Sequence, residues 1–312
     1  MEILYVALKT TFPLLLIMSI GYLVKAVGIF GKEEVSSINK LVYWIFLPIL
    51  LFSSVYQPAL YTLSNVKLLV FSIAGTGLVI VASFVLIPRI VKDHLKTGVV
   101  IQGLVRGNVL YFGIPVITTL LGEAHVGLIS IVLVALVPMY NIVSVIALEK
   151  YSSKQSDVKT MFIKILKNPL IIAAALGIAA VYLKINIPML IMDPLKSIAR
   201  ATTPTALLLL GAAIELTFTK EDLQMVMMTA LTKLIVIPVI ILGAALMIGF
   251  SNEEIVTIFA VFAAPTAVAS YSLAREMDAD YDLAGQIVFL STIASVITIF
   301  CGTVILQWLN IL

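Results

Sequence analysis

Apolar runs of about 20 residues follow one another along most of this sequence, and a helix needs a run of that length to cross the hydrocarbon of a bilayer. We place ten such spans, numbered in chain order: 4–27, 38–57, 67–90, 98–121, 126–148, 168–186, 197–216, 223–249, 254–275 and 282–309. The runs are continuous and lack the alternation of barrel strands, so they are expected to be helices. The sequence therefore predicts an all-α integral membrane protein with ten transmembrane helices.

The composition agrees with this fold class. Hydrophobic residues make up 61% of the chain and charged residues 12%, against about 45–50% and about 25% in soluble domains. The net charge is only +3 and the cations are dispersed, which excludes nucleic acid as an expected partner. One cysteine and two distant histidines offer neither a disulfide nor a metal site. The expected partner is the lipid bilayer, and no cofactor is expected.

The distribution of Lys and Arg predicts an orientation. Thirteen of them lie in the loops on one side of the ten spans and five on the other, while Arg106 and Lys233 fall inside spans. Cytoplasmic loops carry the excess of positive charge. We therefore expect a multi-pass protein of the cell membrane with both termini outside the cytoplasm, the first span being a retained helix and not a cleaved signal.

The most polar connection divides the chain into residues 1–150, a cytoplasmic linker at 151–167 and residues 168–312. Each half holds five spans, an odd number, so the second half enters the membrane from the opposite side and forms an inverted repeat of the first. Weak internal matches fit this prediction: Pro13, Gly21 and Pro48 match Pro169, Gly177 and Pro204 at an offset of 156, and Pro115 matches Pro265 at an offset of 150.

Spans four and nine carry the signals of broken helices. Proline removes a helical hydrogen bond, and a nearby glycine lets the chain leave helical angles. Gly113 and Pro115 supply both in span four, and Pro265 lies at the matching depth of span nine. We expect half-helices to begin near Pro115 and Pro265, with their positive ends meeting at mid-membrane. A simple packing kink is the alternative at each proline.

Two such helix ends favour an anion site. The expected ligands are the backbone amides at Pro115–Val116 and Pro265–Ala267, with hydrogen bonds from Asn108 and Thr266. Arg106 attracts a carboxylate or extends to the interface instead. The complete set of predicted substrate-binding residues is Leu51, Arg106, Asn108, Tyr111, Gly113, Ile114, Pro115, Val116, Ala264, Pro265, Thr266 and Ala267.

Four motifs stand out: Asn108-x-Leu110-x-x-Gly113-Ile114-Pro115 in span four, Pro48 to Phe52 in span two, Lys233 to Pro238 in span eight and Ala274-Arg275-Glu276 at the end of span nine. Together they give the chain a resemblance to the auxin efflux carrier family, which covers plant PIN-type carriers and bacterial organic-anion permeases. It implies two inverted repeats, a scaffold of spans one, two, six and seven, and a moving domain of the others. It also implies an anionic substrate, such as a malate- or malonate-like acid, where spans four and nine cross. The charged pair that plant members carry in span three is absent around Gly75 to Gly77.

These observations predict a secondary transporter that moves a small carboxylate by alternating access. Sodium or proton coupling stays open: hydroxyls of Ser291, Thr292, Ser295 and Thr298 offer sodium ligands, and Glu215 offers a proton carrier. A sodium-coupled symporter of larger amphipathic anions and a passive channel are the alternatives, and a homodimer is left open. An enzyme is not expected, because the chain has neither a zinc-protease motif nor a Ser/His constellation.

Overall fold

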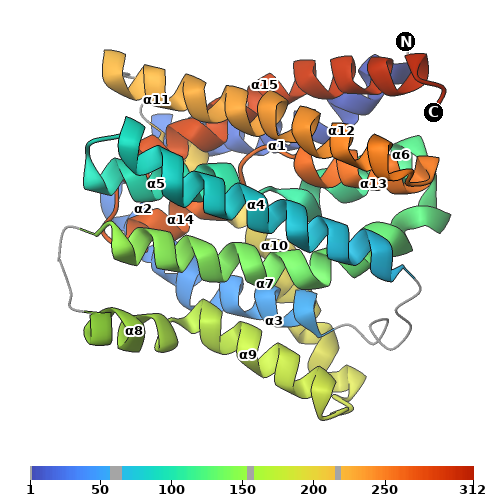
Figure 1. Cartoon of the computed structure of the whole chain (residues 1–312). Coiled ribbons are helices and arrows are strands. Elements are labelled where there is room, and N and C mark those ends of the chain that lie inside the picture. The colour runs from blue at the N-terminus through green and yellow to red at the C-terminus, as the bar shows by residue number, and fades with distance from the viewer. Residues whose placement is uncertain (1, 57–64, 153–157, 215–218) are drawn as a thin grey trace.

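The computed structural model describes residues 2–56, 65–152, 158–214 and 219–312, and its elements are helices joined by short connections (Figure 1). One isolated β-bridge is the only strand-like pairing in these ranges. The elements are α1 (Glu2–Ala26), α2 (Lys32–Leu41), η1 (Val42–Phe46), α3 (Leu47–Val55), α4 (Val66–Ile90), α5 (His94–Val105), η3 (Val109–Gly113), α6 (Ile114–Leu120), η4 (Glu123–His125), α7 (Val126–Lys150), α8 (Val158–Leu166), α9 (Pro169–Tyr182), α10 (Met189–Ala213), α11 (Lys220–Leu231), η5 (Thr232–Val236), α12 (Ile237–Ile248), α13 (Asn252–Phe262), α14 (Ala269–Glu276) and α15 (Tyr281–Trp308).

Six helical stretches in the described part of the chain are long and apolar enough to cross a membrane: Ala7–Ala26, Lys32–Val55, Val66–Ile90, Glu123–Lys150, Lys220–Ile248 and Tyr281–Trp308. Large apolar side chains face outward on the bundle, among them Leu190 at 87% and Met247 at 90% exposure. Lipid, not water, is the solvent that tolerates such a surface. The prediction of an all-α membrane protein is confirmed, while the count of ten spans stays a prediction.

Three prolines are accommodated by widened helical turns. Pro48, Pro115 and Pro238 each follow a π-helical segment, η1, η3 and η5 respectively. A proline clashes with the carbonyl four residues earlier and leaves it without a donor, and a π-turn relieves this by shifting the hydrogen bonds to i→i+5. Helices therefore continue through all three prolines, and the helix breaks lie elsewhere.

Glycines set the closest approach between two long helices. A Cβ on Gly21 of α1 would lie 2.1 Å from the Leu208 carbonyl oxygen, and one on Gly211 of α10 would lie 1.9 Å from that of Met18. Helix α1 thus packs backbone against backbone on α10, as small residues permit in membrane proteins.

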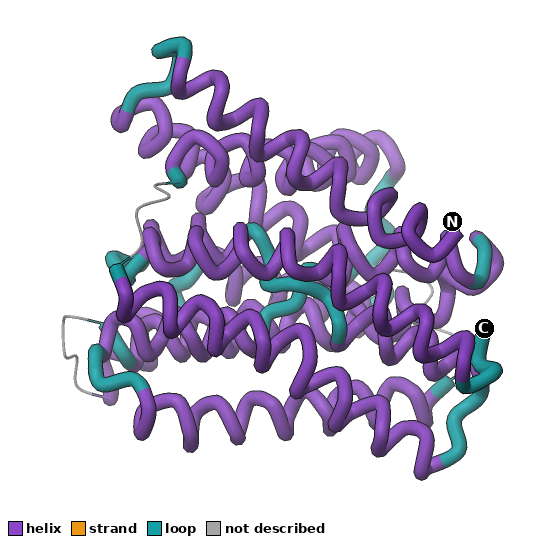
Figure 2. The backbone as a smooth tube through the Cα atoms, turned by 90° about the horizontal axis from the view of Figure 1, so that it is seen from above, coloured by secondary structure: helices purple, strands orange, loops and turns teal. Residues whose placement is uncertain are grey.

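Non-helical segments lie in the centre of the bundle as well as at its ends (Figure 2). Two such segments, between α5 and η3 and between α13 and α14, interrupt helices in the buried middle of the molecule. Irregular backbone at that depth is tolerated where protein covers it or a cavity adjoins it. These two interruptions position the candidate site.

Candidate functional site

The break in span four lies at Arg106–Asn108. Helix α5 ends at Val105, Arg106 has an extended ψ of 98°, and the next helical residue is Val109. The expected start of a half-helix near Pro115 is therefore wrong. Pro115 lies at the beginning of α6, which continues η3 without interruption, because the π-turn absorbs the steric conflict of this proline. Arg106 is itself part of the break.

The break in span nine includes Pro265, as expected. Helix α13 ends at Phe262, and α14 begins at Ala269. The second half-helix therefore begins four residues after the proline. Both interruptions are almost fully covered by protein, with Asn108 at 6% and Thr266 at 1% exposure.

A short antiparallel pairing joins the two breaks, with Gly107 opposite Thr266. The Asn108 N–H donates to the Pro265 carbonyl oxygen at 2.8 Å, and the Ala267 N–H donates to the Arg106 carbonyl oxygen at 3.0 Å. Buried backbone groups released from a helix need such partners. The two broken helices therefore cross in direct contact.

Side chains satisfy further carbonyls at the end of α5. The Thr266 hydroxyl donates to the Gly103 carbonyl oxygen at 2.9 Å, and the Lys233 ammonium donates to that of Leu104 at 2.9 Å. The last carbonyls of a helix lack intrahelical donors and form its negative end, which a cation stabilises. Lys233, a charged residue inside a span, is thus paired with a carbonyl that the break releases.

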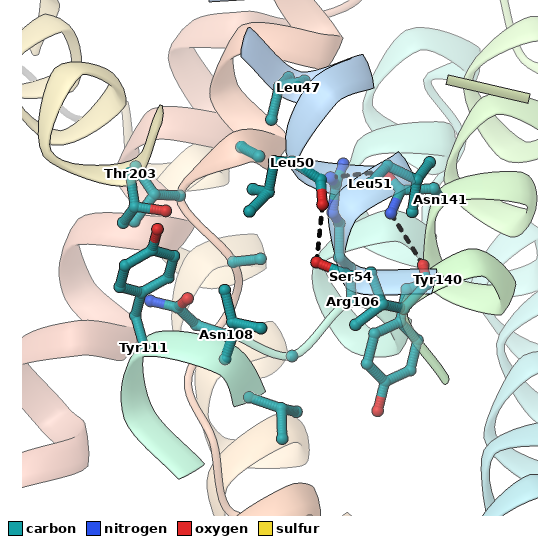
Figure 3. A pocket seen from close by; sticks show the side chains of 17 residues that line it. Leu47, Leu50, Leu51, Ser54, Arg106, Asn108, Tyr111, Tyr140, Asn141 and Thr203 are labelled. Carbon is teal, nitrogen blue, oxygen red and sulfur yellow. Dashed lines mark hydrogen bonds between the residues drawn. The ribbon is translucent and has the colours of Figure 1, made fainter. Parts of the chain in front are cut away.

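A cavity of about 70 Å³ adjoins the crossing. Figure 3 shows its lining side chains converging from span two, from α7 and from the crossing itself, with Tyr111 directed toward Thr203 of α10. The lining residues are Leu47, Leu50, Leu51, Ser54, Arg106, Gly107, Asn108, Val109, Leu110, Tyr111, Val137, Tyr140, Asn141, Thr203, Ala267, Val268 and Ala269. The first residues of both half-helices are among them.

The charge of this cavity is positive. Arg106 is 5% exposed, and its Nη2 donates to the Asn141 side-chain oxygen at 2.7 Å. Its Nη1 is buried without a hydrogen-bond partner, as is the Asn108 side-chain nitrogen. No Asp or Glu is among the lining residues. These two donors, one of which belongs to the guanidinium itself, can bind an anion. A buried charge is stable only when it is paired, and no acidic side chain of the lining pairs with Arg106.

The predicted residues fall into two groups. Leu51, Arg106, Asn108, Tyr111 and Ala267 line the cavity together. The other seven do not line it: Gly113, Ile114, Pro115, Val116, Ala264, Pro265 and Thr266.

The structure contradicts two expected contributions: free backbone amides after Pro265, and a departure from helical angles at Gly113. The Thr266 N–H donates to the Ser291 hydroxyl at 3.3 Å, and the Ala267 N–H is used by the bridge. Gly113 keeps helical angles, with φ −66° and ψ −42°. Its role is close packing, since a Cβ there would lie 2.8 Å from Ile129.

Four polar lining residues were not among the predicted ligands: Ser54, Tyr140, Asn141 and Thr203. The sequence signal that could have found them is a polar residue inside an apolar span. This signal is clearest for Asn141, because a buried amide in a membrane helix needs a partner. The hydroxyls of Ser291, Thr292 and Ser295 donate to carbonyls of their own helix. Glu215 lies outside the described residues.

Comparison with known proteins agrees with this architecture. Residues 6–301 match the family described as "Membrane transport protein". The chain is also similar to a protein of Methanothermobacter thermautotrophicus named "Uncharacterized transporter", with 23% identity over 301 residues that cover 96% of this chain and 98% of the relative. The match extends over both breaks and nearly the whole chain. The protein is thus a membrane transport protein, not an enzyme, and it belongs to the auxin efflux carrier family.

Proposed function

We propose that this transporter carries a small organic anion, with a carboxylate group bound at the crossing of the two broken helices. The observation that carries the proposal is the buried Arg106, whose Nη1 has no hydrogen-bond partner in a cavity lined by no acidic side chain. A carboxylate accepts charge-assisted hydrogen bonds from a guanidinium and neutralises it at the same time.

The two half-helices add to this preference. Val109 and Leu110 in the first turn of one, and Val268 and Ala269 at the start of the other, line the same cavity. Helix N-termini present amides without intrahelical partners and a partial positive charge. In this proposal Asn108 also donates to the carboxylate, and Tyr111 and Leu51 form part of the wall. Pro265 and Thr266 hold the crossing in place.

The cavity is small for its proposed cargo. About 70 Å³ is on the order of two water molecules, whereas ligand pockets are usually about 300 Å³ or more. Binding of a carboxylic acid therefore requires the surrounding helices to separate. The walls suit such a motion, because Leu51 and Thr203 belong to the expected scaffold and Asn108 and Asn141 to the expected moving domain.

Alternating access supplies the motion. In the proposed cycle the moving domain of spans three, four, five, eight, nine and ten shifts against the scaffold. Among the described residues, the polar contacts across this seam include Tyr111 OH to the Ala199 carbonyl at 3.3 Å, Trp44 Nε1 to Glu276 at 2.9 Å, and the Asn39 amide to the Ser272 carbonyl at 3.5 Å. These contacts break and form again as the cavity opens.

The proposal includes ten spans arranged as two inverted repeats of five. The offset of 156 seen in the sequence recurs in the packing: Gly21 approaches the Leu208 carbonyl oxygen, and Gly177 approaches that of Phe52. The Thr202 hydroxyl donates to the Phe46 carbonyl oxygen, and these two residues are themselves 156 positions apart. Contacts between equivalent positions are expected on a two-fold axis.

The bridge favours a different offset for the crossing. A two-fold operation that places Arg106 on Pro265 and Asn108 on Ala267 turns each of its two hydrogen bonds into the other. The residues of each pair are 159 positions apart. Pro115 and Pro265 are therefore not equivalent in the proposed repeat. The proposed orientation has both termini outside the cytoplasm of a cell membrane, because the loops on the opposite side carry most of the Lys and Arg residues.

A thermal-shift screen tests the proposal. Malonate, succinate and malate are titrated against purified protein, each beside the corresponding neutral amide. A ligand that binds only the folded state stabilises it by about 2.7 kcal/mol at 100 times its Kd. The proposal expects at least one acid to raise the melting temperature in a saturable way while its amide does not. Equal responses to acids and amides throughout the panel would contradict an anion site.

A further inference from the structure

A second cavity, of about 290 Å³, lies among the ends of α1, α10 and α14 and the starts of α2 and α15, and it shares no lining residue with the cavity at the crossing. Its cationic lining residues are Lys25 in the last turn of α1, Lys32 at the start of α2 and Arg275 in the last turn of α14. One carboxylate, that of Asp282, also lines it. The net charge of the lining side chains is positive, and nothing in the transport proposal uses them.

Arg275 is held in a fixed position. Its Nη1 donates to the Tyr271 hydroxyl, and its guanidinium lies 5.3 Å from the ring centre of Tyr281 and 6.0 Å from that of Tyr271. None of the three cations forms an ion pair in the described part of the chain, where the ion pairs are Lys96–Asp222 and Lys164–Glu149. A guanidinium oriented by aromatic rings and left without a carboxylate presents its donors to a ligand.

Exposed apolar side chains lie in the chain between two of the cationic lining residues. Val27 and Ile29 lie in the connection between Lys25 and Lys32, and they are 69% and 64% exposed. Apolar side chains exposed beside lysines occur where headgroups meet acyl chains. Basic pockets between transmembrane helices bind anionic lipid headgroups, because a phosphate accepts several hydrogen bonds and matches the fork of an arginine.

We propose that this cavity binds the headgroup phosphate of an anionic phospholipid, with Arg275, Lys32 and Lys25 as its ligands. The exposed Val27 and Ile29 contact the glycerol and the upper acyl chain in this proposal. The same phosphate chemistry belongs to inorganic phosphate in solution, and these apolar neighbours favour the lipid source.

The test measures melting temperature in a neutral detergent while phosphatidylglycerol, phosphatidylcholine or inorganic phosphate is titrated. The wild type is compared with Lys32→Gln/Arg275→Gln. The matched control, Lys40→Gln/Lys92→Gln, removes the same charge from two exposed lysines that do not line the cavity. We expect phosphatidylglycerol to stabilise the wild type and the control, and its half-maximal concentration to rise at least about ten-fold in the cavity variant.

A second variant covers the case in which the loss of Arg275 impairs folding. Lys25→Gln/Lys32→Gln changes two exposed, unpaired side chains and is expected to show the same weakened response. Equal responses of the cavity variants and the control would overturn the site. So would equal stabilisation of the wild type by phosphatidylcholine. Stabilisation by inorganic phosphate at similar concentrations would overturn the lipid assignment. None of these readouts involves transport or a carboxylate, so the result is independent of the proposed substrate.

Discussion

The Asn108 N–H donates a 2.8 Å hydrogen bond to the Pro265 carbonyl oxygen, so two residues from opposite halves of the chain meet where both helices are interrupted. The bond has a counterpart from Ala267 to Arg106. Together they hold the beginnings of two half-helices at one cavity. The stability of this crossing is therefore expected to depend on the side chains that hold the two breaks together.

Thr266→Val is expected to destabilise the crossing. The substitution keeps the shape of the side chain but removes the hydroxyl that donates to the Gly103 carbonyl oxygen. A buried carbonyl left without its donor costs about 1–3 kcal/mol. Thr266→Ser retains the hydroxyl and serves as the control. The melting temperature in detergent should fall for the valine variant by more than for the serine variant, and equal melting temperatures would show that this hydrogen bond contributes little.

Gly211→Ala is expected to separate α10 from α1. The added Cβ would lie 1.9 Å from the Met18 carbonyl oxygen, and a backbone atom cannot rotate away. Overpacking of this kind costs about 1–3 kcal/mol. Gly243→Ala in α12 is the matched control, because its Cβ meets nothing within 4 Å; helix propensity makes it neutral or slightly stabilising. Similar thermal stability of the two variants would argue against the close contact.

The all-helical membrane fold could be predicted from the sequence, because the length of an apolar run can be read from neighbouring residues alone. The breaks could not be placed in the same way. Pro115 suggests a break, but a π-turn accommodates it, whereas the chain leaves the helix at Arg106 because Pro265 and Ala267 supply hydrogen bonds there. Those partners are distant in sequence. Thr203 was missed for the same reason, since α10 brings it to the cavity from another span.

Lys233→Met is expected to weaken both stability and anion binding. The ammonium donates to the Leu104 carbonyl oxygen, and its Nζ lies 3.5 Å from the position of a Cβ on Gly107. Methionine fills similar volume but removes a donor and a positive charge beside the crossing. Lys233→Arg keeps both. Melting temperature and the Kd of the acid found in the screen are measured for each variant. An unchanged Kd in the methionine variant would show that the charge of Lys233 does not contribute to anion binding.

An ion pair at the starts of α5 and α11, just before the apolar spans expected at 98–121 and 223–249, predicts a pH dependence. Lys96 Nζ lies 2.6 Å from Asp222 Oδ1, and this hydrogen bond, followed by one from Thr219, lowers the pKa of the Asp222 carboxyl. A lowered pKa contributes stability above the unfolded value of about 3.9, and that stability is lost as the pH falls through the folded pKa.

Asp222→Asn should therefore lower stability at pH 7 by about 0.2–1 kcal/mol, and its difference from the wild type should shrink toward pH 3. Melting curves across this range, with Glu221→Gln as the control for an adjacent carboxylate, measure the effect. A constant difference at every pH would mean that the pair does not set the stability.

The most direct measurement is the Kd of the identified carboxylate for wild type, Arg106→Gln and Arg200→Gln, each verified to be folded by its melting curve without ligand. Gln at position 106 keeps a donor for Asn141 but removes the buried charge, and Arg200 is an exposed arginine of α10 that does not line the cavity. A hydrogen bond to a charged group contributes about 1.5–3 kcal/mol, which corresponds to roughly a ten- to 150-fold weaker Kd for Arg106→Gln. The account predicts that loss, with Arg200→Gln unchanged; equal affinity in all three proteins would contradict binding of the anion at the crossing.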